Sequence, residues 1–438
     1  MSVRKPQILK GFRDYTPDQM RLRLHVIGIF RQVFERHGFE PVDTPALEYL
    51  EILTGKAGEN EKLMYHFHDQ GDREVGLRYD LTVPLARYFA MHQQDSVLPF
   101  KRYHIAPVWR AEKPQRGRFR EFWQCDADIV GSSSMLADAE AVSVLTDALD
   151  AVNLKRAVVS INHRRLLEAM ARLAGVPESY APTVFRAIDK LDKIGPDGVR
   201  RDLVATGVDE AAANRVVELV TRTGSNDELL DAAAADLEGI AGGSEAVTEL
   251  RELAGYIDSL NVRPGSWKID LSLARGIDYY TGPVFEARVA EPKVGSVAGA
   301  GRYDELVGTF LGRAVPATGM SLGLERILEV IQEFELVPLR ASVADLFVAA
   351  FPDTLRENAR IAHELRLSGL NTDLSMIANR GLGDQMKYAA RRGIPFAIIA
   401  GKDEVQRKVA LIRNLATTEQ REVDIASLAQ EAKLTISG

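Results

Sequence analysis

A segment whose side chains alternate between two kinds of surface constrains the fold of this chain more than any other feature. The mostly apolar set within residues 118–129 is Phe119, Glu121, Trp123, Cys125, Ala127 and Ile129. The mostly polar set is Arg118, Arg120, Phe122, Gln124, Asp126 and Asp128. Successive side chains of a β-strand point to opposite faces of the sheet. The alternation therefore predicts a strand with one face on the core and the other on a cleft.

A partner strand is expected just before this one, because residues 98–130 read as two strands around a polar turn at 111–117. Residues 101–120 hold seven Lys/Arg and one Glu, and Arg102, His104 and Arg110 share a face of the first strand. Arginine forks match phosphate oxygens, and Phe122 offers a ring for stacking on a base. The pattern indicates a nucleoside triphosphate site, and a solvated strand face is the alternative. The chain has no Gly-x-x-x-x-Gly-Lys-Ser/Thr, so a P-loop does not explain phosphate binding.

A second polar cluster follows a strand-like run at 267–273. It consists of Arg275, Gly276, Asp278 and the adjacent tyrosines Tyr279 and Tyr280. Polar groups at the mouth of an apolar strand favour a binding site, although core packing is the alternative for the tyrosine pair.

Composition narrows the class of protein. The 438 residues carry a net charge of −7 and a single cysteine, Cys125, which excludes an intrachain disulfide and a Cys-rich zinc site. No apolar run approaches the roughly 20 residues that span a bilayer, and no secretory signal is expected. We therefore expect a cytoplasmic protein without zinc or a membrane partner. Residues 341–438 are nearly balanced, with 13 Lys/Arg and 12 Asp/Glu, so an RNA partner is permitted.

The chain is expected to hold two to four domains. We predict an α+β core with an antiparallel sheet at 1–175 and 263–336, interrupted by a helical insertion domain at 176–262 that is alanine-rich. A mere surface elaboration is the alternative for that insertion. Strands alternating with helices then predict a compact α/β domain with a mostly parallel sheet at 340–438.

Several motifs together resemble histidyl-tRNA synthetase, a class II aminoacyl-tRNA synthetase. The strand-loop-strand at 110–124 resembles the ATP-binding signature, and Asp43-Thr44-Pro45 resembles the dimer-forming one. Gly319 to Arg326 resembles the third class II signature. Leu273 to Thr281 and Ala300 to Asp304 resemble the two histidine signatures, and 383–396 looks like the anticodon-binding domain. The resemblance covers nearly the entire chain.

The resemblance implies roles for particular residues. Arg275 takes the place of a metal at the α-phosphate and is catalytic together with Arg110. The residues implied in ATP binding are Arg110, Glu112, Arg118, Phe122 and Arg326. Those implied in histidine binding are Asp80, Thr82, Gln124, Asp128, Tyr279 and Tyr280, with Gln124 reaching the carboxylate. Lys113, Gln115 and Arg116 lie in the loop that meets the tRNA acceptor end.

The resemblance thus implies a homodimer that activates L-histidine with ATP and Mg²⁺ and transfers the histidyl group to tRNA(His). The rivals are a non-catalytic histidine-binding paralogue that regulates histidine biosynthesis, and a nucleotide- or RNA-binding scaffold. Such regulatory paralogues usually lack the anticodon-binding domain, whereas residues 340–438 of this chain resemble it. Ala300, Glu305 and Lys113 depart from the family pattern, and Lys113 leaves the reading of the tRNA's first bases open.

Overall fold

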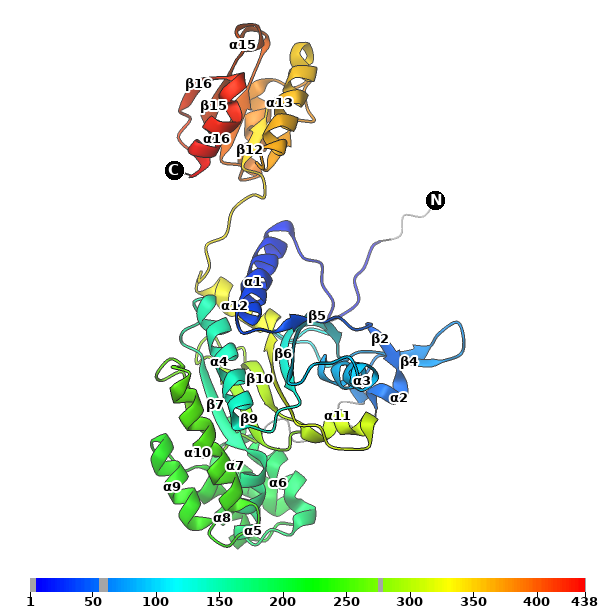
Figure 1. The fold of residues 1–438 in the computed structure, drawn as a ribbon, viewed down its shortest axis with the longest axis vertical. Helices are drawn as coiled ribbons and strands as arrows, with labels where there is room; N and C mark the ends of the chain where they lie inside the picture. Colours follow the sequence, from blue (N-terminus) through cyan, green and yellow to red (C-terminus); the bar gives the residue numbers. More distant parts are fainter. Residues whose placement is uncertain (1–4, 55–61, 275–278, 438) are drawn as a thin grey trace. The chain divides into compact units, whose positions relative to one another are not determined.

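A computed structural model describes residues 5–54, 62–274 and 279–437 (Figure 1). The chain forms two compact units. The larger holds the chain up to Asp14 and Arg23–Val337, and the smaller holds Tyr15–Leu22 and the chain from Pro338 onward. Each unit has its own sheet and its own buried apolar side chains.

An eight-stranded sheet organises the larger unit, in the order β1-β5-β6-β11-β10-β9-β7-β8. All neighbours are antiparallel except the two edge pairs, β1 with β5 and β7 with β8. The strands in sheet order are β1 (Glu40–Pro41), β5 (Phe100–Trp109), β6 (Glu121–Val130), β11 (Ala317–Gly323), β10 (Ser296–Arg302), β9 (Pro283–Arg288), β7 (Val158–His163) and β8 (Trp267–Ile269). This antiparallel core confirms the predicted fold class.

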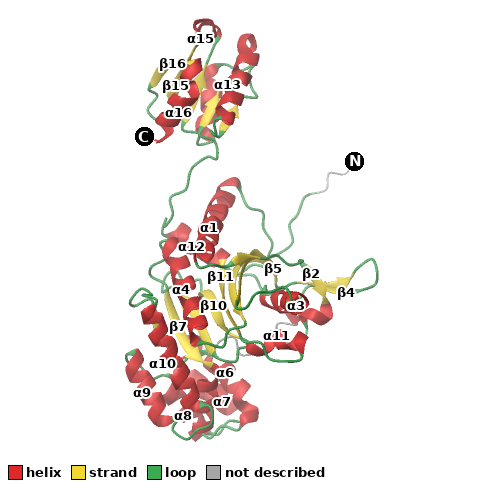
Figure 2. Cartoon of the chain, in the orientation of Figure 1, coloured by secondary structure: helices red, strands yellow, loops and turns green. Residues whose placement is uncertain are grey.

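Helices and a small antiparallel sheet surround these strands (Figure 2). The helices are α1 (Pro17–Arg36), α2 (Leu50–Leu53), α3 (Thr82–His92), α4 (Met135–Ala151), α11 (Asp304–Leu311) and α12 (Leu324–Glu333). The small sheet has the order β2 (Leu47–Tyr49), β4 (Glu74–Leu77) and β3 (His66–His68). Helix α4 begins at a Ser134 cap, whose hydroxyl accepts from the Leu136 amide.

A run of helices connects β7 to β8 and gathers beside that end of the sheet in Figure 1. Its members are α5 (Arg164–Leu173), the 3₁₀ turn η2 (Glu178–Tyr180), α6 (Ala181–Ile188), α7 (Leu191–Ala205), α8 (Glu210–Val220), α9 (Asn226–Asp236) and α10 (Gly243–Ser259). Helix α7 is kinked at Gly195, whose φ of 68° is a left-handed conformation that glycine adopts without a Cβ penalty. The predicted boundaries of a separate insertion domain stay a prediction.

The predicted hairpin is confirmed, because β5 and β6 pair antiparallel over their full lengths. The apolar face of β6 is also confirmed: Cys125, Ala127 and Ile129 are all buried. The polar face differs from the prediction, because Asp126 and Asp128 are buried as well. The run at 267–273 gives a shorter strand than expected, since β8 ends at Ile269.

The smaller unit has a five-stranded sheet in the order β13-β12-β14-β15-β16. Its strands are β12 (Leu346–Val348), β13 (Thr372–Leu374), β14 (Phe396–Ile399), β15 (Val409–Asn414) and β16 (Gln420–Asp424). Its helices are η3 (Pro352–Thr354), α13 (Leu355–Leu367), α14 (Leu382–Arg391), α15 (Lys402–Arg407), η4 (Ile425–Ser427) and α16 (Leu428–Ser437). The expectation of a mostly parallel sheet is wrong, because β14, β15 and β16 pair antiparallel. A short turn joins β15 to β16, and such turns reverse the chain direction.

Candidate active site

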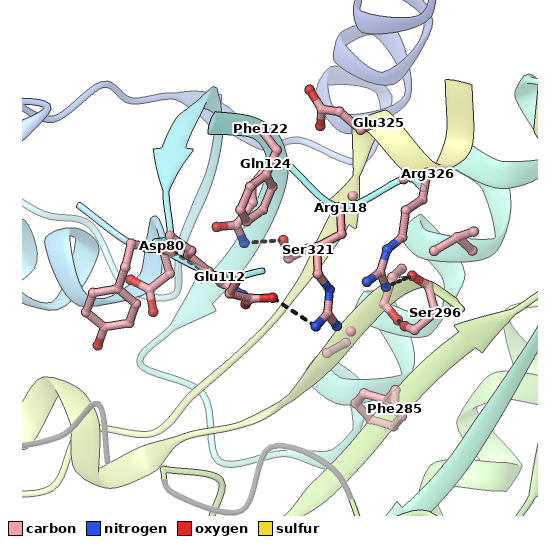
Figure 3. A pocket seen from close by; sticks show the side chains of 18 of the residues that line it. Asp80, Glu112, Arg118, Phe122, Gln124, Phe285, Ser296, Ser321, Glu325 and Arg326 are labelled. Carbon is pink, nitrogen blue, oxygen red and sulfur yellow. Dashed lines mark hydrogen bonds and ion pairs between the residues drawn. The ribbon is translucent and has the colours of Figure 1, made fainter. Parts of the chain in front are cut away.

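A pocket of about 370 Å³ lies over β6, β10 and β11 in the larger unit (Figure 3). It brings together side chains from segments that are far apart in the sequence. The predicted site residues that line it are Asp80, Arg110, Glu112, Arg118, Phe122, Gln124, Tyr279, Tyr280 and Arg326. Sequence reasoning missed other lining residues, which include Phe285, Ser296, Ser321 and Glu325.

Two arginines define one side of the pocket. Arg118 makes an ion pair with Glu112 at 2.9 Å, and Arg326 donates from Nη1 to the Ser296 carbonyl oxygen at 2.5 Å. Gly117 lets the 111–117 turn approach Arg326. Its φ is +66°, and a Cβ there would lie 3.3 Å from Arg326 Cγ. The turn thus holds two guanidinium groups near one ligand position, which suits a polyphosphate.

Arg110, packed against Phe122, adds a third arginine to the pocket wall. The Arg110 guanidinium carbon lies 5.1 Å from the centre of the Phe122 ring, within cation–π range. Arg110 Nε also donates to the Tyr79 carbonyl oxygen at 2.9 Å. These contacts fix the guanidinium in the pocket, where its charge also lowers the pKa of the buried Asp80 carboxyl against the effect of burial.

Two tyrosines and a buried acid occupy another part of the pocket. The rings of Tyr279 and Tyr280 meet edge to face, with centroids 4.7 Å apart. Burial raises the pKa of Tyr279 well above its usual value, so the group remains a phenol that donates a hydrogen bond. Asp80 Oδ1 accepts from the Val83 amide at 3.1 Å at the start of α3. Burial raises the pKa of Asp80, which means that the carboxylate would be stabilised by a cation from a ligand.

Thr82 and Asp128 are buried and do not line the pocket. Thr82 is the first residue of α3. Asp128 forms an ion pair with Arg102 at 2.9 Å and accepts from the Tyr303 hydroxyl. Arg102 was predicted to share a phosphate-binding face with Arg110, but it is 1% exposed and neutralises Asp128 beneath the pocket.

His104 is also withdrawn from the pocket. Its Nε2 lies 2.8 Å from Asp43 Oδ1. Burial, together with the nearby Arg102 and Arg78 guanidinium groups, lowers the pKa of His104 to about 3, so its ring stays neutral. Arg102 and His104 therefore lie beneath the pocket and contribute no cation to a ligand, whereas Arg110 lines it.

The residues predicted for the tRNA loop lie outside the pocket lining. Arg116 makes ion pairs with Glu329 at 3.4 Å and Glu333 at 3.0 Å on α12. Gln115 and Arg118 exchange backbone hydrogen bonds that close the turn, and Lys113 is exposed beside them. The turn is thus tied to α12 at one place and to the pocket at another.

Arg275, the residue predicted for the α-phosphate, lies outside the described residues, as do Gly276 and Asp278. Within the described part of the chain, no group of three or more His, Cys, Asp or Glu residues is arranged to hold a metal ion. In the same described residues, no helix is long and apolar enough to cross a membrane.

Comparisons with known proteins agree on one family. The histidyl-tRNA synthetase family model matches residues 11–327, and an anticodon binding domain model matches 346–434. A histidine–tRNA ligase of Rhodopirellula baltica is 41% identical over 96% of this chain and 95% of its own length. One of Aeropyrum pernix is 42% identical over 93% of each chain. The crystal structure of a histidyl-tRNA synthetase from Nostoc sp. PCC 7120 is 32% identical, has a TM-score of 0.87 and covers 99% of this chain and 100% of its own.

Proposed function

Since the chain belongs to the histidyl-tRNA synthetase family, we propose that it activates L-histidine with ATP and transfers the histidyl group to tRNA(His). One observation carries the proposal. A single pocket holds three arginines around one part of its wall, and a buried acid with two phenols around another. The first set suits the phosphates of ATP, and the second suits an amino acid with an ammonium and an imidazole group.

The charge arrangement fits the chemistry of adenylate formation. The histidine carboxylate attacks the α-phosphate of ATP, forming a bond between carboxylate oxygen and phosphorus while the bond to pyrophosphate breaks. Negative charge gathers at that phosphorus, so fixed cations stabilise the transition state more than the ground state. We assign this role to Arg110 and to Arg275, whose position lies outside the described residues.

The remaining lining residues bind the two substrates in this proposal. Arg118 and Arg326 hold the outer phosphates, and Glu112 orients Arg118 through their ion pair. Phe122 stacks on the adenine ring. Asp80 holds the histidine ammonium. Tyr279 and Tyr280 enclose the imidazole and donate to or accept from its nitrogens.

Mg²⁺ enters, in this proposal, bound to ATP rather than to a cluster of protein ligands. The acids nearest the phosphate side are already engaged. Glu112 pairs with Arg118, and Glu325 pairs with Arg23 at 2.7 Å. The described residues therefore do not form a site of their own for the metal, and the phosphate oxygens would hold it.

We further propose that Lys113, Gln115 and Arg116 contact the acceptor end of the tRNA and that residues 340–438 bind its anticodon, with 176–262 as a separate insertion domain.

We also propose a homodimer. Apolar side chains on the small sheet support it, because Leu47, Tyr49 and Phe67 are each more than 40% exposed. Exposed apolar surface of this kind is typical of an interface. Light scattering at several concentrations tests the dimer, and a constant monomer mass would exclude it.

The regulatory alternative is not favoured, because the chain matches both the synthetase model and the anticodon domain model. ATP–pyrophosphate exchange with each of the twenty amino acids separates the two. Exchange that depends on histidine alone supports the proposal. A folded protein that binds histidine without exchange would support the regulator.

Arg275→Ala should retain histidine binding and lose exchange, and near-normal exchange would exclude its role at the α-phosphate.

A further inference from the structure

A chain of polar side chains runs across β6 and β11 at the pocket. Ser321 and Asp126 lie directly opposite each other in the antiparallel register, so their side chains share a face. The Gln124 amide nitrogen, from two residues earlier on β6, donates to Ser321 Oγ at 2.6 Å. Figure 3 shows this bond, with the oxygen end of the amide on the side of Asp80.

The orientation of the Gln124 amide follows from this bond, because its nitrogen donates and the Ser321 oxygen accepts. Burial, followed by the charge of Asp128, raises the pKa of Asp126 to about 8, while a hydrogen bond from Ser321 opposes that rise. A hydroxyl carries a single proton, and with its oxygen accepting from Gln124, Ser321 keeps that proton for the Asp126 carboxyl.

The amide oxygen of Gln124, Oε1, is a hydrogen-bond acceptor without a donor among the described residues. Gln124 is 7% exposed. A buried amide oxygen without a partner is costly, and a ligand donor that fills the position recovers that cost on binding. Asp80 lines the same pocket and is close enough to raise the pKa of Asp126. Two acceptors thus face the region where the amino acid would bind.

We propose that Ser321 is a positioning residue that holds the Gln124 amide with its oxygen toward the substrate ammonium, in place of the contact to the carboxylate that the family resemblance implies. This rests on the proposed function. An amide has nearly the same shape when its oxygen and nitrogen are exchanged, so hydrogen-bond partners alone decide which end faces a ligand. Without the Ser321 oxygen, the amide turns over freely, and its nitrogen then meets the ammonium donor to donor.

The test compares wild type with Ser321→Ala in ATP–pyrophosphate exchange. Two competitive inhibitors distinguish the ends of the amino acid: histidinol keeps the ammonium and lacks the carboxylate, whereas imidazolelactate keeps the carboxylate and has a hydroxyl in place of the ammonium. Loss of one hydrogen bond to a charged group should raise KM for histidine and Ki for histidinol about tenfold. The Ki for imidazolelactate and KM for ATP should change less than about threefold, because neither ligand brings an ammonium.

Two further variants make the result specific. Ser321→Thr keeps the hydroxyl and should restore the histidinol Ki. Ser160→Ala is the matched control, because Ser160 is also a strand serine whose hydroxyl donates to a carboxyl, that of Asp270 at 3.0 Å, and it lies outside this pocket. An unchanged histidine KM in Ser321→Ala, or equal losses for histidinol and imidazolelactate, would overturn the proposal.

Failure of the proposed function is recognised separately. If wild type shows no histidine-dependent exchange, the activity is refuted, whatever Ser321 does. The positioning role is then measured by titration calorimetry of histidinol and imidazolelactate with the same variants. Selective loss of histidinol affinity in Ser321→Ala supports the role, and equal affinities in wild type and Ser321→Ala refute it.

Discussion

Breaking the ion pair beneath the pocket should strongly destabilise the larger unit. Arg102 and Asp128 are 1% and 2% exposed, and their charged atoms lie 2.9 Å apart. Arg102 also donates to the Leu81 carbonyl oxygen at 3.0 Å. Arg102→Met removes the cation and leaves Asp128 in the interior with the Tyr303 hydroxyl as its hydrogen-bond donor.

The expected loss is about 3–5 kcal/mol of unfolding free energy, because removing one member of a buried pair leaves an uncompensated charge. The loss should be larger at about pH 8 than at about pH 5.5. Burial already raises the pKa of Asp128, with Arg102 opposing the rise, and the variant raises it further. At low pH the acid takes up a proton and escapes the penalty; at high pH it does not.

Urea unfolding followed by tryptophan fluorescence measures this loss. The three tryptophans, Trp109, Trp123 and Trp267, all lie in the larger unit, so the signal reports on that unit. Arg102→Met combined with Asp128→Asn should be less destabilised than Arg102→Met alone, because no charge is then left unpaired. Arg200→Met, which breaks an exposed helix pair with Asp197, should cost less than about 1 kcal/mol. A loss below about 1 kcal/mol for Arg102→Met, or a larger loss at low pH, would refute this reasoning.

Two other perturbations have defined outcomes. Gly301→Ala should raise KM for histidine, because a Cβ there would lie 2.9 Å from two ring carbons of Tyr280; overpacking should also cost about 1–3 kcal/mol in urea unfolding. Hydrogen bonds from His37 to Asp147 and Glu140 raise the pKa of His37 to about 9. Protonated His37 therefore stabilises the folded protein, and this contribution is fully present below about pH 6.5 and is lost as pH rises through about 9. The unfolding free energy from urea titrations should fall by about 1–3 kcal/mol over that range.

Matched variants check both expectations. Gly299 lies on the same strand, and a Cβ there would meet nothing within 4 Å, so Gly299→Ala should unfold close to wild type. An equal loss of stability in both glycine variants would contradict the steric reason. His37→Gln should remove the decline in stability between about pH 6.5 and 9. A wild-type protein whose stability is flat across that range would contradict the role of His37.

Alternation predicted the central hairpin of the fold, and the motifs of the family resemblance predicted nine of the residues that line the pocket. The hairpin of β5 and β6 could be predicted because its apolar face follows the strand period. Strand β10 was not predicted as a strand, since Ala298, Gly299, Ala300 and Gly301 carry no alternating apolar signal. It forms because antiparallel neighbours pair with it on both sides.

The sequence patterns also failed to predict how deeply individual side chains are buried. Alternation placed Arg102 and Arg110 on one face, yet Arg110 lines the pocket while Arg102 is buried beneath it. That difference depends on the partner, because Asp128 lies opposite Arg102 in the strand register. Ser321 was missed for the same reason: its bond to Gln124 follows from the pairing of β11 with β6, which no local pattern encodes.

The proposed position of the substrate ammonium should couple histidine binding to proton release from Asp126. Asp126 has a pKa of about 8, mainly through burial, so it is largely protonated at about pH 7.5. An ammonium bound between Gln124 and Asp80, as proposed, would add a cation near this acid, lower its pKa and release part of its proton. Calorimetry of histidine binding in two buffers that differ in ionisation enthalpy should therefore give two observed enthalpies, and Asp126→Asn should bring them together. Equal enthalpies in the wild-type protein would refute this coupling, because a positive charge close to Asp126 should draw the acid toward its ionised form.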